Sequence, residues 1–192
     1  MLERRGLMGD DEERSLGARE TRLRRASDKE LARSAMRSAA RYGYFVFDDL
    51  ATDEAGLIDY LTVGPPDVTV IVVRDDRGYV SRGDRYEKEL LLDGQPFEDD
   101  PRRQAQELAK DVSQKLFEGQ RSVSSMICFL YAQLEVKDHE IPLGTTPLWE
   151  LPWALDPEGE VVLTPADIEE IAEKIQKIYG RPPIVTPQRE ER

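Results

Sequence analysis

The clearest hydrophobic pattern in the chain lies between residues 56 and 78, where two apolar runs are separated by a short turn. The runs LIDYLTV (57–63) and VTVIVVR (68–74) flank the tetrapeptide Gly-Pro-Pro-Asp (64–67). Runs rich in β-branched residues on either side of a Gly-Pro turn predict two neighbouring strands. The second run shows no polar alternation, which is typical of a strand covered on both faces.

Two charged residues interrupt this apolar hairpin. Asp59 lies within the first run, and Arg74 ends the second. Because side chains alternate along a strand, Asp59 is predicted to point to the same side as Leu57 and Leu61. A carboxylate on an otherwise apolar side must be exposed at the sheet rim, be paired with a cation or hold a metal ion, since burying it alone is costly.

Further elements follow from helical periodicity, capping residues and other apolar runs. Helices are predicted from the Ser27-x-x-Glu30 capping box to Gly43, from Asp100-Pro101 to about Glu118, and from Thr164 to Gly180. Strands are predicted at 44–50, 79–80, 89–92, 122–133 and 161–163. This order indicates an α/β fold, in which a mixed sheet of about five or six strands has helices on both faces.

Length and composition indicate one domain with a charged tail at each end. A chain of 192 residues is long enough for one hydrophobic core of ordinary size. Residues 1–26 contain too few large apolar side chains to offset the entropy of ordering them, so they are predicted to form a mobile tail. We expect a single domain at 27–180 and a second tail at 181–192. The lone cysteine, Cys128, excludes an intramolecular disulfide.

Acidic residues outnumber basic ones, which gives the chain a formal net charge of −12. This charge disfavours broad attraction to nucleic acid or to an anionic membrane. One segment, Arg19–Arg41, is nevertheless locally basic. Two interpretations of it stay open: a solvated helix face, or a contact surface for nucleic acid or for an acidic protein partner.

The sequence shows no secretion signal and no membrane-spanning run. Residues 1–15 begin with charge and lack the apolar segment of a signal peptide. No apolar run approaches the roughly 18 residues that cross a bilayer. We therefore expect a cytoplasmic protein without membrane attachment, and the oligomeric state stays open.

The region from Glu135 to Glu160 has no clear periodicity and contains both tryptophans of the chain. An indole buries a large apolar area, so Trp149 and Trp153 are expected to cover the core. The alternative is that they bind a ligand.

Several motifs, taken together, resemble a known family. Ile58-Asp59-Tyr60, Val63-Gly64-Pro65 and Pro101-Arg-Arg-Gln104 stand where the nuclease-related domain (NERD) family has similar triplets and a Pro-x-x-Gln helix. That family is a branch of the restriction-endonuclease-like PD-(D/E)XK superfamily. The resemblance covers residues 27–131 and implies a restriction-endonuclease-like sheet; the helix near Leu163-Thr-Pro is also similar to the family's C-terminal helix.

The resemblance implies a metal site in outline. The family holds a divalent cation such as Mg²⁺ with carboxylate oxygens, beside a lysine that steadies the attacking water. Asp59 matches the first carboxylate, and Glu30 on the preceding helix is a further candidate ligand. The family's Glu-x-Lys motif, however, falls on Val72-Val73-Arg74. Val72 cannot ligate a metal, and Arg74 is always protonated and cannot act as a base.

This departure predicts a vestigial site formed by Asp59, Arg74 and Gln104, with Arg74 paired to Asp59 in place of a metal. Glu30 and Gln104 also have ordinary explanations, as the capping partner of Ser27 and as a polar residue at a helix edge. A relocated metal ligand would be Asp76, which shares the face of Val72 if the strand continues.

Three functions follow from these patterns. The first is a catalytically degenerate NERD-like domain that needs no cofactor and serves as a nucleic-acid or protein binding module or as a structural module. The alternative is an active DNA nuclease that hydrolyses phosphodiesters with Mg²⁺ or Mn²⁺ and a displaced carboxylate. The third is a protein–protein interaction domain that does not contact nucleic acid.

Overall fold

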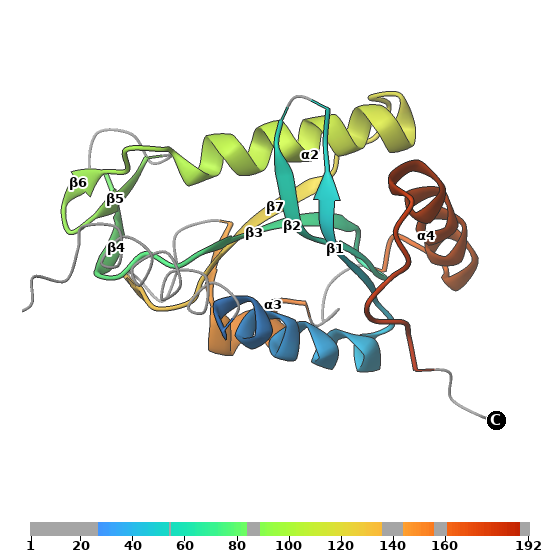
Figure 1. Cartoon of the computed structure of the whole chain (residues 1–192), viewed down its shortest axis with the longest axis horizontal. Helices are drawn as coiled ribbons and strands as arrows, with labels where there is room; N and C mark the ends of the chain where they lie inside the picture. Colours follow the sequence, from blue (N-terminus) through green and yellow to red (C-terminus); the bar gives the residue numbers. More distant parts are fainter. Residues whose placement is uncertain (1–26, 54, 84–88, 136–143, 156–160, 189–192) are drawn as a thin grey trace, which may run out of the picture.

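The computed structural model describes residues 27–53, 55–83, 89–135, 144–155 and 161–188, which form a mixed α/β fold with two sheets (Figure 1). The larger sheet has five strands in the order β1-β2-β3-β7-β9, and the smaller has four in the order β6-β5-β4-β8. In the larger sheet β1, β2 and β3 are antiparallel neighbours, whereas β7 runs parallel to β3 and β9 parallel to β7. The predicted mixed α/β architecture is therefore confirmed.

The larger sheet consists of β1 (Phe45–Ala51), β2 (Leu57–Val63), β3 (Val68–Arg74), β7 (Ser124–Phe129) and β9 (Thr145–Pro147). The smaller sheet consists of β4 (Tyr79–Arg82), β5 (Leu90–Leu92), β6 (Gln95–Pro96) and β8 (Gln133–Leu134). Residues 27–37 form an α-helix that continues into the 3-10 turn η1 (Ser38–Tyr42). The other helical elements are α2 (Pro101–Phe117), η2 (Leu148–Glu150), α3 (Leu151–Ala154) and α4 (Pro165–Tyr179).

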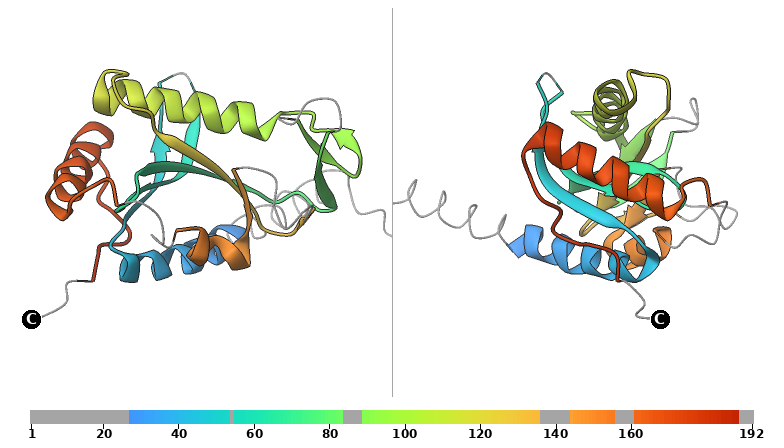
Figure 2. Two further views of the ribbon diagram at one scale, coloured as in Figure 1. Left: turned by 180° about the vertical axis from the view of Figure 1, so that it is seen from behind. Right: turned by 90° about the vertical axis from the view of Figure 1, so that its right-hand side faces the viewer.

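Helices cover both faces of the larger sheet, as predicted. Helices α2 and α4 pack on one face, and the helix at 27–37 and α3 lie on the other (Figure 2). Each face has its own hydrophobic core. The α2-side core contains Val70 and Val72 of β3, and the α3-side core contains Ile71 with Val73 packed against it. This strand therefore alternates strictly between two buried faces, which explains its unbroken apolar sequence.

The predicted capping residues define two of the helices. The Asp100 side chain accepts the N–H of Arg102 at the start of α2, and Thr164 and Asp167 form a reciprocal capping box at the start of α4. Ser27, by contrast, is already helical, and the residues before it lie outside the described chain. No helix within the described residues is long and apolar enough to cross a membrane.

Part of the segment expected to be a C-terminal tail packs on β1. Val185 is buried and forms an isolated bridge with Val46, and the N–H of Ile184 donates to the Val46 carbonyl. The N–H of Gln188 also donates to the carbonyl of Ala40. The packed structure therefore extends past residue 180, against the expectation of a tail at 181–192; the tail predicted at 1–26 lies outside the described residues.

The turn between β2 and β3 anchors two other parts of the chain. The Asp67 carboxylate accepts hydrogen bonds from the Ser124 hydroxyl at 2.8 Å and from the Arg121 guanidinium at 3.3 Å, near the start of β7. The Pro65 carbonyl accepts the N–H groups of Val162 and Leu163. These two residues therefore bond to the turn and do not form the strand predicted at 161–163.

Gly64 in this turn is required by close contact with an aromatic ring. A Cβ atom at Gly64 would lie 2.1 Å from a ring carbon of Tyr44, whose side chain is fully buried in the α3-side core. A ring enclosed by a packed core has little room to move.

Replacing Gly64 by alanine is expected to lower the free energy of unfolding by about 1–3 kcal/mol, because the new methyl group overpacks the contact with Tyr44. Urea denaturation of the purified protein measures the change. Tyr44→Leu removes the ring, so the double variant should lose less stability than the sum of the two single variants. Additive losses would show that Gly64 is needed for another reason.

Candidate functional site

The two central strands separate at Asp59. Strands β2 and β3 pair as far as Tyr60 and Ile71, while β1 stays paired with β2 to Leu57 and β3 stays paired with β7 to Arg74. The β1–β2 hairpin and the β3–β7 pair therefore diverge like the arms of a fork (Figure 1). A fork in a sheet leaves backbone groups without strand partners.

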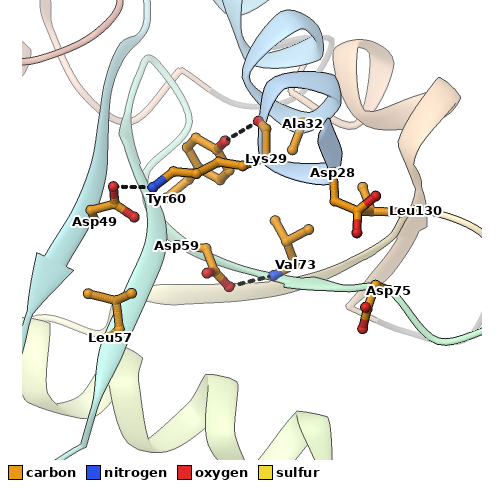
Figure 3. Close-up of a pocket in the computed structure, with 10 residues that line it drawn as sticks. All are labelled: Asp28, Lys29, Ala32, Asp49, Leu57, Asp59, Tyr60, Val73, Asp75 and Leu130. Atoms are coloured by element: carbon orange, nitrogen blue, oxygen red, sulfur yellow. Dashed lines mark hydrogen bonds and ion pairs between the residues drawn. The ribbon is translucent and has the colours of Figure 1, made fainter. Parts of the chain in front are cut away.

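The Asp59 side chain supplies one of the missing partners. Its Oδ2 atom accepts a hydrogen bond of 2.8 Å from the backbone N–H of Val73 (Figure 3). A buried N–H without an acceptor is costly, so the carboxylate satisfies a donor that β2 no longer reaches. Asp59 is thereby held at the opening of the fork.

Asp59 lies on the α3 side of the sheet with Tyr60. Ile58 and Leu61 both lie in the α2-side core, which a strictly alternating strand would not allow. The neighbouring strand is distorted at the same level, where Asp49 has a positive φ of 52°. The prediction that Asp59 and Leu61 share a side is therefore wrong, because the alternation breaks at this carboxylate.

A cavity of about 370 Å³ lies in the fork, between β2, β3 and the helix at 27–37 (Figure 3). Its charged lining consists of four carboxylates and one ammonium group, from Asp28, Asp49, Asp59, Asp75 and Lys29. The rest of the lining is apolar or aromatic and comes from Ala32, Leu57, Tyr60, Val73 and Leu130. Carboxylates therefore dominate the charge of the cavity.

Two of the other carboxylates already have partners. Lys29 forms an ion pair with Asp49, and the Tyr131 hydroxyl donates to Asp28, whose side chain is buried. Asp75 is exposed, and its carboxylate bonds to none of the described residues. Asp75 is therefore the cavity carboxylate that is most open to solvent.

Burial raises the pKa of the Asp59 carboxyl above its ordinary value. The hydrogen bond from the Val73 N–H acts in the opposite direction, as do the positive charges of Lys29 and Arg74, while the charge of Asp49 adds to the rise. Desolvation is the largest of these effects. The folded protein therefore favours a proton on Asp59 more than an exposed chain does.

The residues predicted to form one site lie in different places. Asp59 lines the fork cavity, whereas Arg74 and Gln104 line a separate groove of about 580 Å³ beside Phe97. Glu30 is exposed and pairs with Arg37 at 3.2 Å. Of the predicted residues, only Asp59 belongs to the cavity.

Arg74 does not pair with Asp59, contrary to the prediction. Its guanidinium donates to Asp76 at 2.7 and 3.3 Å and lies 5.8 Å from the centre of the Phe97 ring. The physical reason is alternation along β3, which places Arg74 on the side of Val72 and away from Asp59.

The prediction that Asp76 could serve as a relocated metal ligand beside Asp59 is also wrong. Asp76 is occupied by Arg74, and it is Asp75 that shares the cavity with Asp59. Within the described residues, no three His, Cys, Asp or Glu side chains are placed to hold a metal ion together.

Sequence reasoning missed four of the five charged residues in the cavity: Asp28, Lys29, Asp49 and Asp75. A usable signal existed for two of them. Asp49 interrupts the apolar run YFVFDDL, and Asp75 directly follows the apolar run of β3. Strands β1 and β3 run in the same direction on either side of β2, so charges near their C-terminal ends lie at the same end of the sheet, and that pattern could have located the cavity.

In the helix at 27–37 the basic residues of this segment are paired with carboxylates, whereas Arg41 is exposed and forms no ion pair with the described residues. The pairs are Lys29 with Asp49, Arg33 with Asp48, and Arg37 with Glu30. Asp48 is almost fully buried, so its pair with Arg33 joins the helix at 27–37 to β1. These three pairs favour the interpretation of a solvated helix face over a contact surface for nucleic acid. Residues 19–26 of the segment lie outside the described chain.

Relative to wild type, Asp59→Asn is expected to gain stability as the pH rises above the unfolded-state pKa of about 3.9. Because the folded-state pKa of Asp59 is raised, the wild type loses stability as the pH rises from that value through the folded-state pKa. Asparagine does not titrate and can still accept the Val73 N–H. Urea denaturation at a series of pH values measures the difference. A difference that does not change with pH would contradict the burial argument.

Asp59→Ala serves as the matched variant, because it removes both the charge and the acceptor. We expect it to be less stable than Asp59→Asn by about 1–3 kcal/mol at every pH, since the Val73 N–H then has no partner. Equal stabilities would show that this hydrogen bond is dispensable.

The cavity combines a half-buried, hydrogen-bonded aspartate with further carboxylates and a single ammonium group. Such a lining attracts positively charged groups and repels phosphate. No protein-family model matches the chain, and searches of curated proteins and of solved structures find no match.

Proposed function

We propose that the chain is a NERD-like domain of the restriction-endonuclease type that has lost catalysis and serves as a protein-binding or structural module. The order of the elements supports the resemblance: Glu30 lies on the helix at 27–37, Asp59 on β2, and Gln104 in the first turn of α2. The triplet Val63-Gly64-Pro65 ends β2 and begins the turn into β3.

The observation that carries the proposal is the position of Val72. It lies one residue beyond the last β2–β3 pair, at the level of Asp59, where the family has its second carboxylate. Val72 is buried in the α2-side core, and Arg74, at the position of the family's lysine, is held by Asp76. The cavity around Asp59 therefore contains neither an oxygen ligand nor a cation from the Glu-x-Lys position.

The charge of the cavity favours a protein partner over nucleic acid. A phosphate backbone is bound by clustered, unpaired lysine and arginine side chains. In the described helix at 27–37, Lys29, Arg33 and Arg37 are each paired with a carboxylate, and the adjacent cavity is acidic. These features oppose binding of a polyanion on this face.

One observation favours the alternative of an active metal-dependent nuclease. Asp75 shares the cavity with Asp59 and Lys29, so it is the carboxylate best placed to act as the displaced ligand. Two oxygen ligands and a lysine would be the minimum for holding Mg²⁺ or Mn²⁺ and orienting a water molecule.

Thermal melting with and without Mg²⁺ or Mn²⁺ separates the two functions. We expect a change in melting temperature of less than about 1 °C, because an ion that does not bind the folded state cannot stabilise it. A Mn²⁺-dependent rise that disappears in Asp59→Asn and in Asp75→Asn would support the nuclease. Cleavage of plasmid or single-stranded DNA that is lost in Asp59→Ala would decide for it.

Binding of a labelled DNA duplex and of single-stranded RNA tests the choice of partner. We expect no binding at physiological salt, because the three cations of the helix at 27–37 are each paired with a carboxylate of the domain. Binding that weakens steeply with salt, and is lost when Arg22, Arg24 and Arg25 are replaced by glutamate, would overturn the protein-binding assignment.

A further inference from the structure

Both tryptophans of the chain are exposed, although they were expected to cover the core. Trp149 is 59% exposed and Trp153 is 66% exposed. Leucines on the other side of the same segment take the core positions: Leu151 and Leu155 are buried in the α3-side core, with Leu148 packed against it. The η2–α3 segment is therefore anchored by leucines and turns its indoles outward.

The two indoles line one cavity. They are four residues apart, which brings side chains to the same face of a helical segment. The cavity has a volume of about 490 Å³, and its other described lining comes from Thr145, Thr146, Glu150 and Ala154. Exposed aromatic groups gathered around a hollow are typical of an interaction site, whereas scattered single ones are not.

The charge of the lining indicates the kind of group that fits. Glu150 is the only charged residue among the described lining, it is half-buried, and it forms no ion pair within the described chain. Indole rings attract cations through their electron-rich faces, and a guanidinium group can stack on them while it bonds to a carboxylate. The net charge of −12 adds a long-range attraction for a basic partner.

We propose that Trp149, Trp153 and Glu150 form a binding site for an arginine side chain in a basic segment of a partner protein. The guanidinium stacks against the indoles, and the Glu150 carboxylate accepts its hydrogen bonds. The site shares no described lining residue with the Asp59 cavity, so it does not rest on the function proposed for that cavity.

The chain offers a direct readout, because Trp149 and Trp153 are its only tryptophans. Intrinsic tryptophan fluorescence therefore reports on this site alone. The full chain is titrated with the acetylated and amidated peptide Gly-Arg-Gly-Arg-Gly, and in parallel with the peptides in which both arginines are lysine, leucine or glutamate. We expect a saturable change with the arginine peptide, a weaker one with lysine, and none with leucine or glutamate.

Single-residue variants then show how much Glu150 and Trp153 each contribute to binding of the arginine peptide. Glu150→Gln keeps the shape of the side chain and is expected to weaken binding of the arginine peptide about two- to five-fold, as is Trp153→Ala, whose remaining indole still reports. Glu170→Gln removes one exposed charge from α4, on the other face of the sheet, and should leave binding unchanged. Far-ultraviolet circular dichroism confirms that each variant is folded.

Three results would overturn the proposal. One is the absence of any saturable change with the arginine peptide. Another is equal binding of the leucine peptide, which would make the site an apolar groove for a different partner. The third is Glu150→Gln binding as tightly as wild type at low salt, since the carboxylate would then have no part in recognition.

Discussion

The hydrogen bond between the Asp59 carboxylate and the Val73 N–H is the contact on which the candidate site depends. It lies where β2 leaves β3, and it lets the sheet open without leaving a buried donor unsatisfied. The fork cavity, its acidic lining and the raised pKa of Asp59 all follow from this separation. The Asp59 side chain thus provides the hydrogen-bond acceptor that the neighbouring strand would otherwise supply. The carboxylate is partly desolvated as a result, which disfavours its charged form.

The alternation of side chains along β3 then determines which charged groups can contact each other. Val73 faces the cavity, whereas Val72 and Arg74 belong to the other side. Arg74, on the side of β3 opposite to Asp59, forms no ion pair with that carboxylate and bonds to Asp76 instead. Charged residues of β2 and β3 therefore line two separate surfaces, one on each side of the sheet.

Much of the fold was predictable because its signals are local. The runs at 57–63 and 68–74 are the strands β2 and β3 themselves, and Asp100 and Thr164 cap α2 and α4 as predicted. The site was less predictable, because it depends on which face each residue occupies. Asp49 and Asp59 interrupt the apolar runs, but the sequence does not show that the backbone is distorted there and that the following side chains change faces.

The tryptophans show the same difficulty on a helical segment. Their size suggested burial, but the spacing of Leu148, Leu151 and Leu155 decides which side of the segment faces the core. Trp149 and Trp153 lie on the other side and remain exposed. Periodicity is therefore a stronger guide to burial than side-chain size, but this segment is too short to show its period clearly in the sequence.

The two edges of the larger sheet are unlike. At one edge, β1 is bridged at Val46 by Val185 and distorted at Asp49, two devices that block the approach of a further strand. At the other edge, β9 has no further strand partner among the described residues. β9 is only three residues long, all three are buried, and it ends at Pro147, which has no N–H to donate. Both edges of the larger sheet are therefore protected against the addition of another strand, each in its own way.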